Sequence, residues 1–224
     1  MTQTETTGNE AETSVARVPK QKRSRDTQEK ILNAAFEAFA ESGYAGASIN
    51  KIAERAGVAQ PLVVYHFPSK DALWVASVEG ALDQFMKRLL PDLEALKELD
   101  PATRLSLIFR EFVRYSATVP AMLEIMIDAN KRQSANLTKV VEDRLRPVYV
   151  RLCELIEAAQ KTGAIPAGDP GLIYYSLIAV ASTPFSLSRE FKQLTGRDPL
   201  EPEMVEAQAD LLVQLFFPGM GQTG

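Results

Sequence analysis

Cysteine, histidine and tryptophan are almost missing from this chain of 224 residues, which holds one of each. The single cysteine, Cys153, excludes an intramolecular disulfide, and this fits a reducing, cytoplasmic setting. No uninterrupted apolar run approaches the roughly 20 residues that a membrane-spanning helix needs, so we expect no membrane contact. The polar N-terminus has no apolar segment after a basic start and does not read as a secretory signal.

Residues for catalysis or metal binding are also scarce. His66 has no second histidine with which to share a metal ion or a proton. The chain has no Gly-rich phosphate loop, no His/Cys cluster at zinc spacing and no nucleophile elbow. We therefore predict no enzyme activity, no cofactor and no metal site. Cys153 is expected to be a small buried side chain, with a redox sensor as the alternative.

The net charge of −4 is unevenly distributed along the chain. Residues 17–70 carry nine Lys/Arg against five Asp/Glu, whereas residues 71–224 carry sixteen against twenty-one. A basic module joined to an acidic body suggests that only the module meets an anionic partner. Residues 1–24 are predicted to be a disordered leader that ends in a basic cluster, Lys20–Arg25. This cluster is either a solvated tail or an arm that touches DNA.

Helical periodicity dominates the rest of the chain and predicts an all-α fold of about nine helices. In the first helix Ile31, Ala35 and Phe39 form one apolar stripe, and Gly43 ends it. The predicted helices cover residues 26–42, 48–56, 60–67, 70–90 (alternatively to 98), 101–120, 121–130, 135–162, 170–194 and 203–217. Pro147 and Pro184 are expected to bend their helices. We predict a DNA-binding module over residues 25–70 and a ligand-binding and dimerisation domain over residues 71–218.

Two of the predicted helices are short and joined by a turn that contains Gly57, which is typical of a helix-turn-helix. The second helix of such a motif presents side chains to base edges in the major groove, and the first braces it. An inward apolar set can hold the pair rigid: Ile52, Ala53, Val58, Val63 and Phe67. The neighbouring residues of the second helix are then free to face outward.

Residues 43–73 carry a specific pattern that includes Gly43-Tyr44, Ala56-Gly57-Val58, Tyr65-His66-Phe67 and Lys70-Asp71-Ala72-Leu73. With this pattern the chain resembles the tetracycline-repressor-like (TetR/AcrR) family of regulators. The resemblance covers about 45 residues when the helix before Gly43 is included. The rest of the chain matches in helix number and length only.

This resemblance implies a set of DNA contacts. By this resemblance, Tyr65, His66 and Lys70 are expected to contact DNA phosphates, and such contacts position the protein without reading the base sequence. By the same resemblance, Asn50 and Gln60 are expected to contact base edges, and the side-chain amide of each can bind adenine in a bidentate manner. The full predicted DNA-binding set is Ser48, Asn50, Lys51, Gln60, Pro61, Leu62, Val64, Tyr65, His66 and Lys70. Ser48 would also cap its helix, and Val64 departs from the tyrosine that many members carry there.

The resemblance further implies that helices four to seven enclose a cavity for a small-molecule inducer. The candidate lining residues are Trp74, Phe85, Tyr115, Met126, Asn130, Tyr149 and Tyr174. Packing in the core is the alternative role for such side chains.

Helices eight and nine are implied to form a homodimer interface. Their composition agrees, because the eighth carries Leu172, Ile173, Ser176, Leu177, Val180 and Ala181 and the ninth carries the stripe Val205, Ala209, Leu212 and Phe216. The alternative is that these stripes close the core of one subunit.

The sequence thus predicts a DNA-binding regulator, in family terms a repressor, that leaves a near-palindromic operator when a small molecule binds. Two alternatives remain: a DNA-binding dimer whose body only dimerises or recruits a partner, and an all-α enzyme acting on a hydrophobic small molecule. Because the connection from Phe67 to Lys70 is short, movement of the fourth helix would displace the recognition helix.

Overall fold

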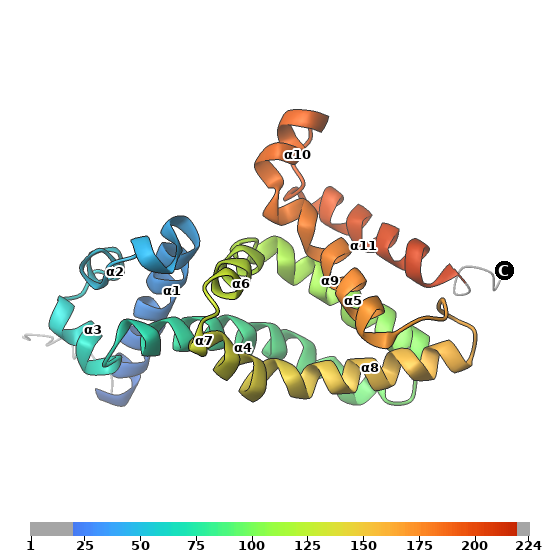
Figure 1. Ribbon diagram of the computed structural model, residues 1–224, viewed down its shortest axis with the longest axis horizontal. Helices are drawn as coiled ribbons and strands as arrows, with labels where there is room; N and C mark the ends of the chain where they lie inside the picture. Colours follow the sequence, from blue (N-terminus) through green and yellow to red (C-terminus); the bar gives the residue numbers. More distant parts are fainter. Residues whose placement is uncertain (1–19, 219–224) are drawn as a thin grey trace, which may run out of the picture.

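The computed structural model describes the backbone of residues 20–218, with all side chains of this part except those of residues 20, 21, 23 and 89–95. Every regular element in this part is helical, which confirms the all-α prediction (Figure 1). The elements are α1 (Lys20–Gly46), α2 (Ile49–Ala56), α3 (Gln60–His66), α4 (Lys70–Leu96), α5 (Pro101–Thr118), α6 (Ala121–Lys131), α7 (Ala135–Val140), the π-helical segment η1 (Val141–Leu145), α8 (Arg146–Lys161), α9 (Pro170–Ser186), α10 (Ser188–Thr195) and α11 (Pro202–Phe216). The predicted seventh helix corresponds to α7, η1 and α8, and the predicted eighth to α9 and α10.

Helix α1 begins six residues before the start that the sequence predicted. Lys20 to Arg25 form its first turns, so the end of the predicted leader is helical here, whereas residues 1–19 of that leader lie outside the described residues. Near its other end Gly43 has φ 65° and ψ 173°, which interrupts the helix at the predicted place. Only glycine adopts this backbone conformation at little cost.

The ends of several helices follow from local capping chemistry. Ser48 accepts a hydrogen bond from the Lys51 backbone N–H at 3.2 Å and starts α2, and Gly57 ends it with φ 67°. Asp100 and Asp169 cap α5 and α9 in the same way, each followed by proline in the first turn. These caps lie where the sequence predicted them.

Helix α4 connects the two parts of the molecule. Its first turn packs within the module formed by α1, α2 and α3, and the helix then runs into the body, where it contacts α5 and α7 (Figure 1). The helix ends at Leu96, close to the longer of its two predicted extents, which ended at residue 98. Helix α6 lies between the module and the body in the same view.

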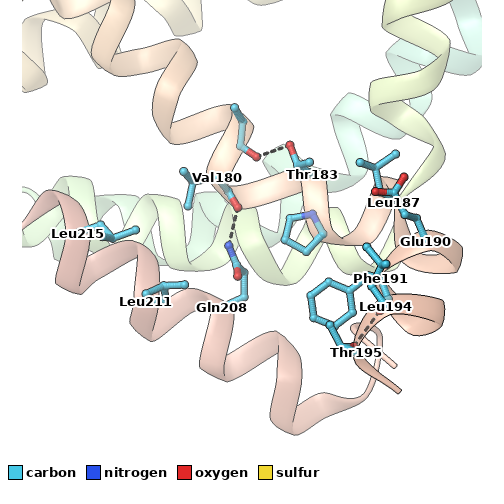
Figure 2. A pocket seen from close by; sticks show the side chains of 12 residues that line it. Val180, Thr183, Leu187, Glu190, Phe191, Leu194, Thr195, Gln208, Leu211 and Leu215 are labelled. Carbon is cyan, nitrogen blue, oxygen red and sulfur yellow. Dashed lines mark hydrogen bonds between the residues drawn. The ribbon is translucent and has the colours of Figure 1, made fainter. Parts of the chain in front are cut away.

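Proline shapes the region around α9. Pro184 has no N–H for the carbonyl of Val180, four residues earlier. That carbonyl instead accepts a hydrogen bond from the Gln208 side chain of α11 at 2.6 Å (Figure 2). Helix α9 ends two residues after Pro184, and α10 continues at an angle of 71° to it. The predicted bend is therefore present, and it also provides a docking point for α11.

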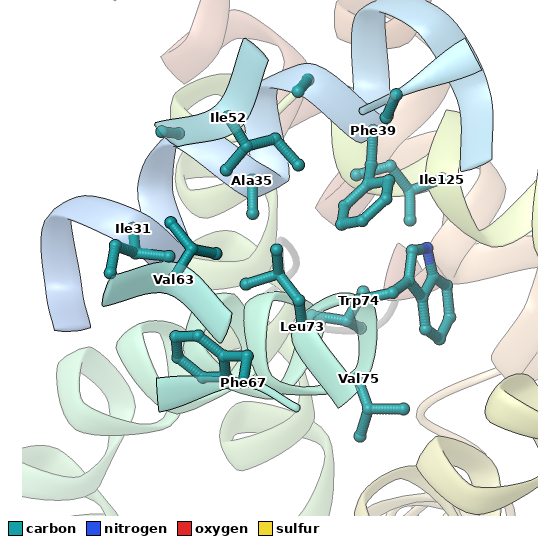
Figure 3. Packing of buried hydrophobic residues seen from close by; sticks show 14 of the residues in the cluster. Ile31, Ala35, Phe39, Ile52, Val63, Phe67, Leu73, Trp74, Val75 and Ile125 are labelled. Atoms are coloured by element: carbon teal, nitrogen blue, oxygen red, sulfur yellow. The ribbon is translucent and has the colours of Figure 1, made fainter. Parts of the chain in front are cut away.

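Two main hydrophobic cores hold these helices together. The N-terminal core unites Ile31, Phe39 and Val63 with Trp74 of α4 and Ile125 of α6 (Figure 3). The C-terminal core joins α5, α8, α9 and α11 around buried side chains such as Phe109, Leu177 and Leu212. Helix α6 thus belongs to the core of the N-terminal module although it is distant from that module in sequence.

Among residues 20–218 no single helix is long and apolar enough to span a membrane. The bent pair α9 and α10 passes that test of length and composition only when its two parts are taken together.

Candidate DNA-binding surface and internal cavity

The α2–α3 unit is held rigid from inside. Ile52 and Val63 are completely buried, and Ala53 and Phe67 are nearly so. Val58 packs against the same core while remaining partly exposed. These are the five residues that the sequence predicted to brace the motif. A short helix held by such a core keeps its outer side chains in a fixed arrangement.

The outer side of this unit carries most of the predicted DNA contacts. Tyr65 is 81% exposed, Val64 48% and Leu62 37%, so α3 exposes three large apolar or aromatic side chains within four residues. The other exposed members of the predicted set are Asn50, Lys51, Gln60 and Pro61. The structure therefore brings these seven residues together on the surface of α2 and α3.

Three predicted contacts are more constrained. Ser48 is half-buried and its hydroxyl is engaged in the cap of α2. His66 is half-buried, with its ring edge-on to Tyr65 at 5.2 Å between centroids. Lys70 directs its ammonium over the ring of Tyr44, 4.6 Å from the centroid, and towards the Ala45 carbonyl at 3.4 Å. Burial lowers the pKa of Lys70, and the charge of Arg132 lowers it further.

Lys70 belongs to a set of polar residues that we call the junction cluster, which consists of Tyr44, Lys70, Asp71, Asp128, Arg132 and Asn136. The Tyr44 hydroxyl donates to Asp71 at 2.7 Å, and the Asn136 amide donates to the same carboxylate oxygen. The Arg132 guanidinium also lies over the Tyr44 ring, 4.3 Å from its centroid. One aromatic ring thus contacts cations from both α4 and the residue that follows α6.

Asp128 completes the junction cluster. Its carboxylate accepts the backbone N–H of Tyr44 at 3.3 Å and the Arg132 Nε–H at 3.0 Å. A Cβ at Gly43 would contact this carboxylate at 3.7 Å, so the carboxylate lies close to the break in α1. The junction cluster joins α1, α4, α6 and α7, and apart from Lys70 the sequence analysis assigned no role to its members. Its pairs are separated by up to 84 positions, so no local pattern reveals them.

Burial raises the pKa of Tyr44 to about 12, and its hydrogen bond to Asp71 contributes to this rise. The hydrogen bonds from Tyr44 and Asn136 in turn lower the pKa of Asp71. The pair therefore consists of a neutral phenol and a carboxylate at neutral pH, which is the combination in which the hydrogen bond forms.

The body contains a cavity of about 600 Å³. Five predicted lining residues are among those that surround it: Tyr115, Met126, Asn130, Tyr149 and Tyr174. The sequence analysis missed all of the others, which are Leu82, Phe112, Ser116, Val119, Pro120, Met122, Leu123, Ile127, Leu137, Val141, Leu145, Arg146, Tyr175, Ile178, Ala179, Ser182 and Thr183. They come from α4 to α9, so the eighth predicted helix also contributes. A volume of this size is ordinary for a small-molecule site.

Two predicted lining residues lie elsewhere. Trp74 is 1% exposed and packs in the N-terminal core beside Phe39 and Ile125, so its assignment to the cavity was wrong (Figure 3). Phe85 is not among the lining residues. Its ring packs against two rings that do line the cavity, with centroids 4.9 Å from that of Tyr115 and 5.5 Å from that of Phe112. Helical spacing alone did not show which way these two rings turn.

The π-helical segment η1 keeps one side of its helix against the cavity. Leu137, Val141, Leu145 and Tyr149 line it at steps of four residues. In a regular α-helix each such step overshoots a full turn by about 40°, so the row would rotate away from the cavity. The wider turn at Val141–Leu145 corrects this rotation. Pro147, which we expected to kink the helix, follows immediately in the first turn of α8.

An apolar groove lies on the outer side of α9, α10 and α11 (Figure 2). Leu211 and Leu215 of α11 are 45% and 55% exposed there, and Leu194 of α10 is 78% exposed. On the other side of α11, Val205, Ala209 and Leu212 are buried in the C-terminal core. The predicted interface stripe thus closes the core of the subunit, and a second stripe one position away faces outward.

Among the described residues no group of three or more His, Cys, Asp and Glu side chains has the arrangement of a metal site. Cys153 is half-buried in α8, four residues after the cavity-lining residue Tyr149 of the same helix. Its hydrogen bond with Tyr149 raises the pKa of that tyrosine.

Comparison with known proteins covers both parts of the chain. A family model described as bacterial regulatory proteins, tetR family, matches residues 31–76, and one described as tetracyclin repressor-like, C-terminal domain, matches residues 101–215. The HTH-type transcriptional regulator RutR of Escherichia coli (strain K12) is 41% identical over 71 residues, which are 30% of this chain and 34% of RutR. The chain therefore aligns with only about a third of that relative's length.

A second relative aligns over more of the chain. The HTH-type transcriptional regulator LmrA of Bacillus subtilis (strain 168) is 27% identical over 175 residues, which are 71% of this chain and 90% of LmrA. Among solved structures, AibR in complex with isovaleryl coenzyme A and operator DNA superposes with a TM-score of 0.67 at 19% identity. This superposition covers 85% of the present chain and 98% of AibR, and at this identity it shows the fold.

Proposed function

The chain belongs to the TetR family of bacterial regulatory proteins, and we propose that it is a homodimeric, cytoplasmic DNA-binding regulator. A small molecule that binds in the cavity of its body regulates its binding to DNA. The observation that carries this proposal is the rigid α2–α3 unit, whose outer side exposes Tyr65 by 81%. Leu62, Val64 and Tyr65 are all exposed within four residues of α3, which supports a partner surface there, and the basic balance of residues 17–70 points to an anionic partner.

The contacts that we propose follow from exposure. Gln60 and Asn50 lie exposed on α3 and α2 and read base edges, while Tyr65 and His66 contact phosphates. Leu62, Pro61 and Val64 offer apolar surface to thymine methyl groups. Ser48, Lys51 and Lys70 lie nearby and add hydroxyl or ammonium groups for phosphate oxygens. Lys70 must leave part of its contact with Tyr44 to do so.

We place the dimer interface on the outer side of α9 and α11. The exposed stripe of α11 includes Leu211 and Leu215, and α9 exposes Leu172 by 70% and Tyr175 by 67%. Two antiparallel copies of this helix pair would form a four-helix bundle about a two-fold axis. A two-fold dimer fits a near-palindromic operator and doubles the phosphate contacts.

The cavity and the DNA-binding module share helix α6, which supports regulation by a ligand. Met126 and Asn130 line the cavity, whereas Ile125 and Ala129 of the same helix are buried in the N-terminal core. The helix also carries Asp128 of the junction cluster. A ligand that favours one position of α6 therefore changes the position of α1 and of the first turn of α4, in proportion to its differential affinity for the two states.

Operator binding tests this proposal. Genomic fragments bound by the purified protein are selected, and their affinity is measured by fluorescence anisotropy at several salt concentrations. We expect binding that weakens with salt, and a Tyr65→Phe variant that binds all fragments less tightly. Gln60→Ala should mainly relax base preference. Absence of salt-dependent binding to any fragment would overturn the proposal.

Repression with release by an inducer is the mode that we propose over a ligand-independent one. A thermal-shift screen of small molecules, followed by anisotropy with each hit, separates the two. If every molecule that stabilises the protein leaves operator affinity unchanged, the body serves only for dimerisation or partner recruitment.

A further inference from the structure

The cavity has a chemical character that identifies the class of its ligand, and this inference rests on the ligand role proposed above. Most of its lining is aliphatic or aromatic, including Phe112, Met122, Met126 and Ile178. A molecule that fills it must therefore bury a largely apolar body.

Four of the polar side chains in the wall donate to carbonyls of their own helices. The hydroxyls of Ser116, Ser182 and Thr183 donate to the carbonyls of Phe112, Ile178 and Ala179, at 2.7 Å in each case. The Asn130 amide donates to the Met126 carbonyl at 2.8 Å. These groups do not require a polar partner in the middle of the cavity.

Charge in the wall has one sign. Among the described lining residues Arg146 is the only charged one, and none is acidic. A cationic ligand would lose its hydration without gaining a counter-charge, which is strongly unfavourable. An anionic group placed near Arg146 would find a planar guanidinium suited to two parallel hydrogen bonds.

Arg146 lies at the edge of the cavity and not in its depth. It is the first residue of α8, directly after η1, and its side chain is 57% exposed. It forms a two-fold hydrogen bond with Glu142, at 2.5 Å for both contacts, and the Glu142 side chain is 49% exposed. A pair this exposed is weak, so a ligand anion held by the apolar cavity can replace Glu142 as the partner of Arg146.

We propose that the cavity binds a carboxylate amphiphile, with the apolar body inside and the carboxylate at the edge on Arg146. Glu142 acts as the internal competitor that occupies Arg146 when no ligand is bound. Arg146 thereby determines the preference of the cavity for acids over neutral or cationic molecules of the same shape.

Three probes of equal chain length test this preference: decanoate, decanol and decylamine, which is a cation at pH 7. Their affinities for the full-length protein are measured by isothermal titration calorimetry. We expect decanoate to bind at least about tenfold more tightly than decanol, and decylamine to bind most weakly. Equal or tighter binding of decanol or decylamine overturns the proposal, and so does the absence of binding by all three.

Two substitutions move the preference in opposite directions. Arg146→Gln should bring the affinity for decanoate down to that for decanol, and Glu142→Gln should raise the affinity for decanoate several-fold by freeing Arg146. Arg151→Gln, an exposed arginine of α8 outside the cavity lining, is the matched control and should keep the acid preference. If Arg146→Gln retains the preference, or Glu142→Gln lowers it, the assignment is wrong.

The opposite signs of the two variants separate a loss of binding from a loss of folding, since misfolding cannot raise affinity. Operator binding by the ligand-free wild type is measured in parallel. Its absence would overturn the proposed regulatory function and leave the ligand preference standing. Conversely, operator binding with no acid preference overturns this inference alone.

Discussion

The Tyr44 hydroxyl donates a hydrogen bond to the Asp71 carboxylate at 2.7 Å, and this contact ties the end of α1 to the first turn of α4. The same carboxylate accepts the Asn136 amide from α7. Three helices therefore meet at one side chain, beside the lysine that we propose as a phosphate contact. The relationship leads to a direct test of how the module is held.

Replacing Tyr44 by Phe removes the hydroxyl and keeps the ring that Lys70 and Arg132 contact. We expect the free energy of unfolding to fall by about 0.5–1.5 kcal/mol, because Asp71 loses one donor. Urea denaturation monitored by circular dichroism measures this change. Tyr65→Phe is the matched control, since Tyr65 is exposed outside the junction cluster, and it should leave stability unchanged while weakening operator binding. Equal stability of the two variants would contradict the role given to Tyr44.

The pH dependence of stability should reveal Asp71. Its hydrogen bonds from Tyr44 and Asn136 lower its pKa below the ordinary value of 3.8. A group with a lowered pKa in the folded state stabilises the fold above its unfolded pKa, and this contribution is lost as the pH falls through the folded pKa. The stability difference between the wild type and Asp71→Asn should thus be constant from pH 5 to 7 and shrink below about pH 4. Urea titrations at each pH measure it, and a constant difference down to pH 3 would count against the prediction.

Gln208 should stabilise the packing of α11 on α9 because it supplies the donor that Pro184 denies to the Val180 carbonyl. Gln208→Leu is expected to lower the free energy of unfolding by about 1–3 kcal/mol, since the carbonyl is left without a partner. In a Pro184→Ala background residue 184 regains its N–H, so the same change should cost less. A double-mutant cycle measured by urea denaturation gives the coupling, and additive effects would refute the explanation.

The outer stripe of α11 predicts the oligomeric state. Leu211→Glu places a charge in the proposed interface and should convert the dimer to a monomer, as measured by multi-angle light scattering. Operator affinity should fall more than about tenfold, because half of the phosphate contacts are lost. Leu99→Glu, at an exposed leucine between α4 and α5, serves as the control and should remain dimeric. A monomeric wild type, or a dimeric Leu211→Glu variant, would rule out this interface.

The features that could be predicted from sequence are those determined by neighbouring residues. Ser48, Gly57 and the Asp–Pro pairs at Asp100 and Asp169 mark helix ends through local hydrogen bonds, so their positions agree with the structure. The bracing set around Val63 was also correct, because Val63 and Phe67 are four residues apart and lie on the same side of the chain's helical turn.

Tertiary choices could not be predicted in the same way. Helix α11 has two apolar stripes, and periodicity does not tell which one, Val205 to Leu212 or Leu211 to Leu215, faces the subunit's own core. Trp74 has the composition of a ligand contact, but the turn of α4 at which it lies is covered by α1 and α6. The partners of Asp71 come from α1 and α7, at positions 27 and 65 residues away.

The shared helix α6 has a consequence for any attempt to treat the chain as modular. A cut after Lys70 would strip the N-terminal core of Leu73, Trp74 and Ile125, and would expose the apolar sides of α1 and α3. A chimaera that transfers this DNA-binding specificity to another body must therefore carry a matching α6 surface, or redesign it. Exchange of operator specificity between such proteins is then simplest through the exposed residues of α2 and α3 alone, which leaves every buried contact in place.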